Sequence, residues 1–238
     1  MIFAMIFAHL AGDYLFQWDS LAAWKRRDVR GVAVHSLIVT LVTLILANWV
    51  DSRWWPWALF IGFAHLGIDM AQFYLQRRLP RRGLFSLGAF CLDQTAHGAI
   101  MALALFRSGV MPLSLFSAEW LSWLQHHALG LTILAYLFIS LPAWVLIEFL
   151  SYGLAQGSEP NFAEAAQGKF VGILERGLML TSVWQGYALL MPLVVLPRLL
   201  IEHSAARPLE VQRLTVTRIL VSMSLTLLAG LALQRLTG

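Results

Sequence analysis

Long apolar stretches alternate with short polar connections along most of the chain. A helix needs about 20 apolar residues to cross the hydrocarbon core of a bilayer, and several stretches reach that length. Backbone polar groups in lipid must be satisfied within their own segment, so such stretches form helices. The pattern predicts an all-α, polytopic transmembrane bundle of six or seven spans, at about 1–18, 31–50, 57–76, 84–106, 129–152, 169–200 and 214–236.

These spans group into a four-helix membrane domain, an interfacial connection and the C-terminal transmembrane helices, at 1–106, 107–127 and 128–238. Within the connection, Ser117–Leu124 carries tryptophan and leucine and is suited to lie along the membrane interface as a short helix. The first span ends near Trp18, and a continuation of its helix as far as Trp24 is an alternative. The sixth span is long enough to be tilted or broken near Pro192 and Pro197.

Three His/Asp pairs interrupt the apolar pattern of the first domain. The segments are HLAGD at His9–Asp13, HLGID at His65–Asp69 and, in reversed order, DQTAH at Asp93–His97. Residues four apart share one face of a helix, so each pair presents both side chains on one side. Ionisable groups within a membrane are costly and face the protein interior, which makes them candidates for a functional site.

The reversed third pair predicts that the three pairs meet. The first and third spans run in one direction and the fourth runs in the other, so the reversal places all three aspartates at one depth and all three histidines at another. His35, on the second span, lies nearer the basic connections. We therefore expect one intramembrane cluster formed by the three pairs and His35.

Imidazole nitrogen and carboxylate oxygen together suit Zn²⁺, Mn²⁺ or Fe²⁺, and so many donors favour one or two ions. The candidate metal ligands are His9, Asp13, His35, His65, Asp69, Asp93 and His97. Of these, Asp13, Asp69 and Asp93 are also candidate catalytic residues. Gln17 and Gln94 are expected to orient ligands, although amides that only bridge helices are an alternative. A proton relay or a structural staple would also use such a cluster.

The composition favours a membrane protein, because 59% of the residues are hydrophobic and only 13% are charged. The net charge is +4, and basic residues gather in two connections, at Lys25, Arg26, Arg27 and Arg30 and at Arg77, Arg78, Arg81 and Arg82. In a membrane protein such clusters mark the cytoplasmic face, so a nucleic-acid partner is not expected. Binding of anionic lipid head groups or of a phosphorylated ligand is the alternative.

Two basic residues are candidate anion binders. Lys25 begins the basic connection after the first span, and Arg176 lies early in the sixth span, next to Glu175. Adjacent helical residues point about 100° apart, so Glu175 and Arg176 should each have a partner elsewhere. A ligand phosphate or carboxylate is one such partner for Arg176, and a tie between helices is the other.

One combination of residues carries a resemblance: HLAGDYLFQ at His9–Gln17, HLGID at His65–Asp69 and DQTAH at Asp93–His97, with Lys25 and His35 between them. In this combination the chain resembles the bacterial membrane family catalogued as domain of unknown function 3307. The segment GKFVGILERGLM at Gly168–Met179 resembles a second block of that family's longer members. The resemblance implies a multi-pass protein of the bacterial inner membrane and no activity.

By its polar pattern the first half is also similar, more distantly, to membrane-bound metal-dependent hydrolases. Together with the cluster, this similarity favours a hydrolase that acts on a lipid-linked or amphipathic substrate from the cytoplasmic side. The alternatives are a transporter or channel that carries protons or metal ions and a non-catalytic accessory subunit. Membrane lipid is an expected partner, and the sequence does not identify a partner protein.

Overall fold

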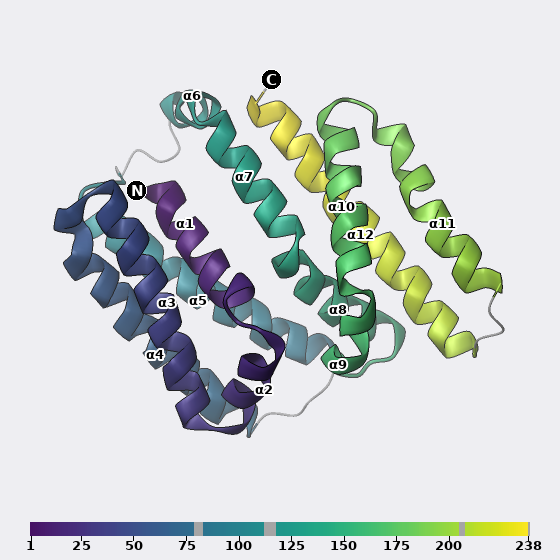
Figure 1. The fold of residues 1–238 in the computed structure, drawn as a ribbon, viewed down its shortest axis with the longest axis horizontal. Coiled ribbons are helices and arrows are strands. Elements are labelled where there is room, and N and C mark those ends of the chain that lie inside the picture. The colour runs from purple at the N-terminus through teal and green to yellow at the C-terminus, as the bar shows by residue number, and fades with distance from the viewer. Residues whose placement is uncertain (79–82, 112–117, 205–207, 238) are drawn as a thin grey trace. The chain divides into compact units, whose positions relative to one another are not determined.

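The computed structural model describes residues 1–78, 83–111, 118–204 and 208–237, and these residues form helices and no strand. Figure 1 shows their arrangement. The N-terminal helices are α1 (Ile2–Leu10), α2 (Asp19–Arg27), α3 (Val29–Val50), α4 (Trp55–Gln76) and α5 (Gly83–Arg107). They are followed by α6 (Ala118–His126), α7 (Ala128–Ile139), α8 (Leu141–Ala155), α9 (Phe162–Ala165), α10 (Lys169–Trp184), α11 (Met191–Ser204) and α12 (Leu209–Thr237).

Among the described residues, four helical segments are long and apolar enough to cross a membrane. They are α3, the segment Ser52–Gln76 that contains α4, α5 and α12. The pair α7 and α8, bent by 42° at Ser140, makes a fifth if it is one span. The all-helical prediction is confirmed, but length and composition support four or five spans here rather than six or seven.

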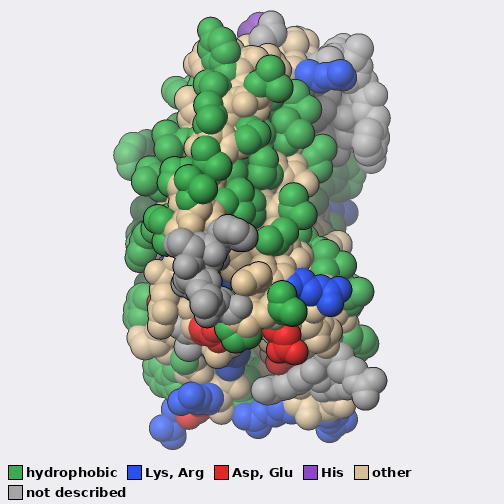
Figure 2. Space-filling model, turned by 90° about the vertical axis from the view of Figure 1, so that its right-hand side faces the viewer, with side chains coloured by type: hydrophobic (Ala, Val, Ile, Leu, Met, Phe, Trp, Pro, Cys, Tyr) green, Lys and Arg blue, Asp and Glu red, His purple; other side chains and the backbone are tan. Residues whose placement is uncertain are grey.

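The helices expose apolar side chains to an extent that suits lipid. Trp49 is 84% exposed, Phe63 72% and Leu189 93%. Figure 2 shows hydrophobic side chains over much of the face it draws, with most of the Lys and Arg side chains in its lower half and a further group near the upper right. A face of this kind matches an apolar membrane interior bounded by a basic interface.

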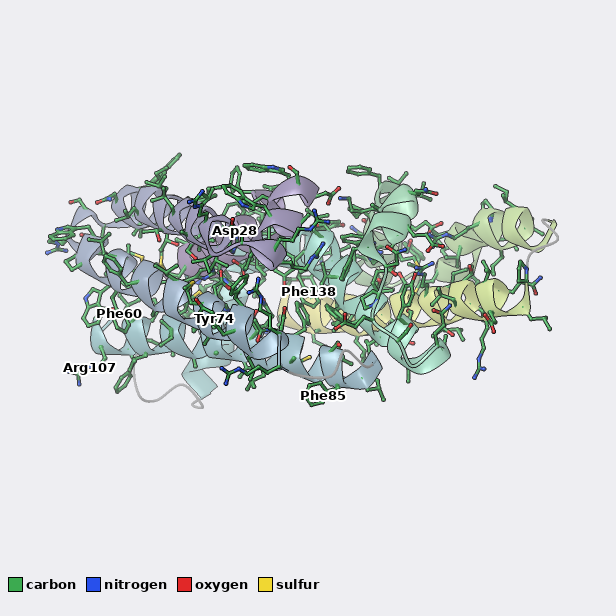
Figure 3. The ribbon with its side chains drawn as sticks, turned by 90° about the horizontal axis from the view of Figure 1, so that it is seen from below. Asp28, Phe60, Tyr74, Phe85, Arg107 and Phe138 are labelled. Atoms are coloured by element: carbon green, nitrogen blue, oxygen red, sulfur yellow. The ribbon has the colours of Figure 1, made fainter. Side chains whose placement is uncertain are left out.

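The first compact unit comprises residues 1–80 and 89–120 and is centred on α3 and α4. Figure 3 shows these two helices side by side, with Asp28 at the start of α3 and Phe60 and Tyr74 on α4. One end of the unit has an apolar core from α1, α3, the 3₁₀ turn Ser52–Trp54, α4 and α5, formed by Met5, Ala47, Trp54, Ala58, Ile61, Ala104 and Leu105.

The first span is not one helix that continues to Trp24, so that alternative is wrong. α1 ends at Leu10, and a π-helical turn follows at Ala11–Leu15 before the chain leaves helical geometry ahead of α2. Close packing accompanies the turn, because a Cβ added to Gly12 would lie 3.0 Å from Val39 Cγ2. π-Helical turns of this kind are common at functional sites.

The second unit comprises residues 81–88 and 121–238, in which α12 packs against α8 and α10. The predicted sixth span is instead two helices, α10 and α11, which Figure 1 shows side by side and joined by a turn. The break lies at Gly186, whose φ is 87°, and not at Pro192 or Pro197. Glycine takes this left-handed conformation without the steric cost that a side chain adds.

The predicted connection at 107–127 contains the helix α6, which agrees with a short helix near Ser117–Leu124. Residue 117 and the basic residues Arg81 and Arg82 lie outside the described residues. The α5 helix is shared between the units, because Gly83–Gly88 belongs to the second and the residues from Ala89 onward to the first.

Candidate metal centre

The three His/Asp pairs and His35 come together inside the first unit, as the reversed third pair predicted. They arrive from four elements: α1 with its π-helical turn, α3, α4 and α5. Six of the seven side chains belong to buried residues, and the seventh, Asp93, has a side chain only 12% exposed. The cluster thus concentrates ionisable groups where burial of unpaired charge is costly.

Two imidazoles form the centre of the cluster. His35 Nε2 and His65 Nε2 lie 3.3 Å apart. Asp69 Oδ2 lies 3.5 Å from His35 Nε2 and 3.3 Å from His65 Nε2, so the three atoms form a triangle of potential metal ligands. Asp13 Oδ1 completes a second triangle on the same pair of nitrogens, at 3.4 Å from His35 and 3.5 Å from His65.

These triangles have the dimensions of a metal site. Ligand atoms at 2.0–2.2 Å from a tetrahedral ion are about 3.3–3.6 Å apart, since an edge is about 1.6 times the centre-to-vertex distance. The triangle formed by His35, His65 and Asp69 falls in this range on all three edges. Asp13 Oδ1 is buried and has no hydrogen-bond partner, so it retains lone pairs for an ion.

His97 is arranged as metal-binding histidines are. Its Nδ1 donates to the backbone carbonyl oxygen of Asp93 at 2.9 Å, which assigns the proton to Nδ1. The lone pair is then on Nε2, which is buried and has no hydrogen-bond partner. A histidine that ligates a metal through one nitrogen commonly donates the other N–H to a carbonyl in this way.

Asp69 belongs to two potential ligand sets. His35, His65 and Asp69 form one, and Asp69, Asp93 and His97 form another. The two oxygens of Asp69 approach different histidines, because Oδ2 lies 3.3 Å from His65 Nε2 and Oδ1 lies 3.9 Å from His97 Nε2. A third set comprises His9, Asp13 and His65, in which His9 Nδ1 is 3.7 Å from Asp13 Oδ2.

Lys25 reaches the cluster from α2. Its Nζ lies 2.9 Å from Asp69 Oδ1 and 2.8 Å from Asp69 Oδ2. The anion that this predicted anion binder meets is therefore a carboxylate of the chain itself. Ser36 Oγ donates to the same carboxylate, at 3.4 Å from Oδ2. Sequence reasoning missed this contact, although Ser36 directly follows His35.

The two glutamines behave differently. Gln94 Nε2 donates to Asp93 Oδ2 at 3.2 Å, while its Oε1 accepts from Tyr14 Oη at 2.9 Å. Gln94 thus orients a candidate ligand, and Tyr14, which the sequence reasoning did not select, orients Gln94. Gln17 lies beyond the π-helical turn, and its buried Oε1 has no hydrogen-bond partner.

Arg176 is not part of the cluster, because it lies in the second unit. Its Nε donates to the carbonyl oxygen of Ile139 at 2.6 Å and its Nη2 to that of Ser140 at 2.9 Å, at the bend between α7 and α8. Its neighbour Glu175 pairs with Arg198 at 3.1 Å, so each found a partner elsewhere, as expected. These contacts favour the reading in which Arg176 ties helices together.

A small cavity borders the cluster. Its volume is about 10 Å³, which is close to the space that one water molecule needs. The residues that line it are three histidines, His9, His65 and His97, together with residues of α1, α3, α4 and α5 that are apolar except for Thr43: Met5, Val39, Thr43, Ile61, Ile100 and Met101. One water beside three imidazoles is compatible with metal coordination or proton transfer.

The comparisons with known proteins agree with the resemblance seen in the sequence. Residues 1–129 match the family described as protein of unknown function (DUF3307), and this segment carries every member of the cluster. No curated protein and no solved structure matches the chain. Since the matched segment covers more than half of its length, the chain belongs to the DUF3307 family of proteins of unknown function.

Proposed function

We propose that this protein is a metal-dependent hydrolase of the bacterial inner membrane, with a divalent metal centre in its first unit. The observation that carries the proposal is the triangle of His35 Nε2, His65 Nε2 and Asp69 Oδ2, whose edges of 3.3–3.5 Å match the spacing of ligands around one ion. The proposed substrate is a lipid-linked or amphipathic molecule that reaches the centre from the cytoplasmic side.

The charge balance supports a bound cation. With neutral imidazoles, the three carboxylates Asp13, Asp69 and Asp93 and the one ammonium of Lys25 leave two negative charges in a buried cluster. Burial of uncompensated charge is costly, so compensation is required. One divalent ion supplies that compensation, and the mixture of imidazole and carboxylate donors suits Zn²⁺, Mn²⁺ or Fe²⁺.

A second ion, together with a bound anion that balances its charge, is proposed beside the first. Asp69 directs one oxygen toward His35 and His65 and the other toward His97, and it belongs to both ligand sets. A carboxylate in this position can bridge two ions. Asp93 Oδ1 and His97 Nε2 are buried and have no hydrogen-bond partner, which makes them suitable ligands for the second ion.

The chemistry follows from this arrangement. Bound ions supply Lewis acidity toward a phosphoryl or acyl oxygen and make water more acidic. Asp13, with a buried oxygen free of hydrogen bonds, is the candidate general base, and Gln94 holds the Asp93 carboxylate in place. The small cavity beside His9, His65 and His97 has room for the attacking water.

The proposed topology places both basic connections on the cytoplasmic side. Six or seven spans result if the shorter apolar helices Ile2–Leu15 and Ala188–Ile201 also cross the membrane, in addition to the longer ones. Residues near Lys25 then lie at the cytoplasmic interface, where an amphipathic substrate presents its polar group.

Elemental analysis of the detergent-purified protein, prepared without chelator, tests the metal centre. We expect Zn, Mn or Fe at one or two ions per chain. Activity is tested in mixed micelles with phosphatidic acid, an isoprenyl diphosphate and an acyl ester, each with added metal or with chelator. Metal-dependent hydrolysis of at least one substrate class is expected. Folded wild-type protein that binds no divalent ion refutes the metal centre, and metal-loaded protein inactive on all three classes counts against the hydrolase.

A second candidate function rests on the spacing of the imidazoles. The ring centroids of His9 and His97 are 5.4 Å apart, those of His97 and His65 4.2 Å, and those of His65 and His35 5.3 Å. This chain of four titratable rings favours a proton-conducting transporter, and two protonated histidines would balance the cluster's charge as one divalent ion does. Proton flux in proteoliposomes that contain metal-free protein distinguishes this function from the hydrolase.

A further inference from the structure

We propose that Lys25 is a tethered cation that changes partners when the centre is loaded, from the Asp69 carboxylate to a phosphate group of the ligand. This inference rests on the proposed metal centre and names the ligand chemistry that the centre would select. Its starting point is that Lys25 Nζ contacts both oxygens of Asp69, at 2.9 and 2.8 Å, which places the ammonium directly on a candidate metal ligand.

The ammonium and the first metal ion compete for the same oxygen. An ion bound to Asp69 Oδ2 lies about 2.0–2.2 Å from that atom. Lys25 Nζ is 2.8 Å from it, so the two cations are at most about 5 Å apart while both remain on Oδ2. Like charges in a buried site repel strongly, and a divalent ion doubles the repulsion. Loading the centre therefore drives the ammonium away from Asp69.

Lys25 can move because it lies at the edge of the cluster. Its side chain is 22% exposed, whereas that of Asp69 is 1% exposed. Its backbone is held in place, since a Cβ added to Gly31 of α3 would lie 2.6 Å from the Lys25 backbone nitrogen. A fixed backbone and a flexible four-carbon stem confine the ammonium to a small region between the cluster and the surface.

The surroundings of that region favour an anion. Five exposed arginines lie at the end of α2, at the start of α3 and directly after α4: Arg26, Arg27, Arg30, Arg77 and Arg78. One exposed carboxylate, that of Asp28, lies among them. Arg77 Nη2 also donates to the carbonyl oxygen of Arg27 at 3.1 Å, which links the ends of α2 and α4. A ligand that approaches from this end meets positive charge first and the metal centre behind it, an order that suits a phosphate group.

The ligand class is therefore a phosphate-bearing molecule, whose phosphate contacts the metal centre on one side and Lys25 on the other. A neutral ester would leave the displaced ammonium with water as its only new partner, because the Lys25 side chain is 22% exposed. A phosphate provides both the charge and the acceptor oxygens that Lys25 loses when it leaves Asp69.

The test measures metal and phosphate binding separately. Wild type and the variants Lys25→Met and Lys25→Arg are loaded with Zn²⁺ in detergent, and inorganic phosphate is titrated by calorimetry. Lys169→Met is the matched control, because Lys169 is the only other lysine and lies in the second unit. We expect Lys25→Met to bind Zn²⁺ at least as tightly as wild type and phosphate at least 10-fold more weakly. Lys25→Arg should retain part of the phosphate affinity, and the control should resemble wild type.

A second arm identifies the source of the phosphate. Nanodiscs that contain phosphatidic acid should compete with inorganic phosphate if the ligand is a lipid head group, whereas phosphatidylcholine nanodiscs should not. Competition by phosphatidic acid supports a lipid ligand, and its absence with retained phosphate binding supports a soluble one.

Two results overturn the inference and leave the metal centre intact. One is a metal-loaded Lys25→Met variant that binds phosphate as wild type does, and the other is wild type that binds Zn²⁺ but no phosphate. Loss of Zn²⁺ from a folded Lys25→Met variant also contradicts the competition between the two cations. Wild type that binds no divalent ion refutes the proposed function, and this inference with it.

Discussion

Asp69→Asn is the substitution that perturbs the cluster most selectively, because it removes one charge and nearly conserves shape. Asp69 contacts Lys25 at 2.8 Å, His65 at 3.3 Å, Ser36 at 3.4 Å and His35 at 3.5 Å. Removal of a residue that only supports a metal ligand costs about 10–100-fold in affinity, so loss of a ligand proposed for both ions should cost at least about 100-fold. That factor corresponds to about 3 kcal/mol.

The same substitution also affects folding stability through Lys25. The attraction between unit charges at this distance is about 6 kcal/mol at an effective dielectric constant of about 20. Lys25 is 22% exposed and can turn toward water, which recovers most of this energy. We expect a net loss of about 1–3 kcal/mol in the free energy of unfolding. Equilibrium dialysis against Zn²⁺ measures the affinity, and the fluorescence of the 10 tryptophans follows thermal unfolding.

Glu148→Gln is the matched control. Glu148 is also buried, and it accepts from Arg218 Nη2 at 2.7 Å and Nε at 3.0 Å in the second unit. This variant should lose stability by a similar mechanism and retain its metal. If Asp69→Asn keeps wild-type metal affinity while both variants unfold at similar lower temperatures, the cluster is a structural staple and the metal centre is refuted.

Three further outcomes are expected. In a Cys91→Ser background, a cysteine at Arg27 should be shielded from an impermeant thiol reagent in intact cells while one at Ser52 is labelled, and the opposite pattern would invert the topology. Arg176→Lys should lower the melting temperature, with a loss of about 1–3 kcal/mol from unsatisfied carbonyls at the α7–α8 bend, and leave metal content unchanged. Gly31→Ala should separate α2 from α3 at a cost of about 1–3 kcal/mol and weaken phosphate binding, as measured by calorimetry on metal-loaded protein.

Local pattern was sufficient for several conclusions. Apolar stretches of membrane length predicted an all-helical chain, and the structure has helices of that kind. The spacing of four residues in each His/Asp pair predicted shared helix faces, because helical geometry is local. The reversed order at Asp93–His97 further predicted that the pairs meet, since adjacent spans run in opposite directions.

The length of the apolar stretches was not enough to predict where the helices end and the chain turns. Gly186, in the sequence WQGY, marks the turn between α10 and α11, whereas the prolines near which a break was predicted lie within α11. Gln185 followed by Gly186 is typical of a turn, but the apolar residues on both sides favoured one continuous span. Similarly, the local pattern of the first span did not predict the π-helical turn at Ala11–Leu15, which forms where Gly12 packs against Val39.

Only the tertiary structure assigned partners to the charged residues. Lys25 stands in a run of basic residues, where a cation exposed to water would be expected, yet it contacts Asp69, which is 44 residues away. Arg176 donates to the carbonyl of Ile139, 37 residues away, although its sequence neighbour is a glutamate. Sequence spacing determines which side chains share a helix face, and the packing between helices determines which of those faces meet. For this protein the residue types and their spacing predicted a polar cluster, while long-range packing placed His35 and His65 at its centre and Lys25 at its edge.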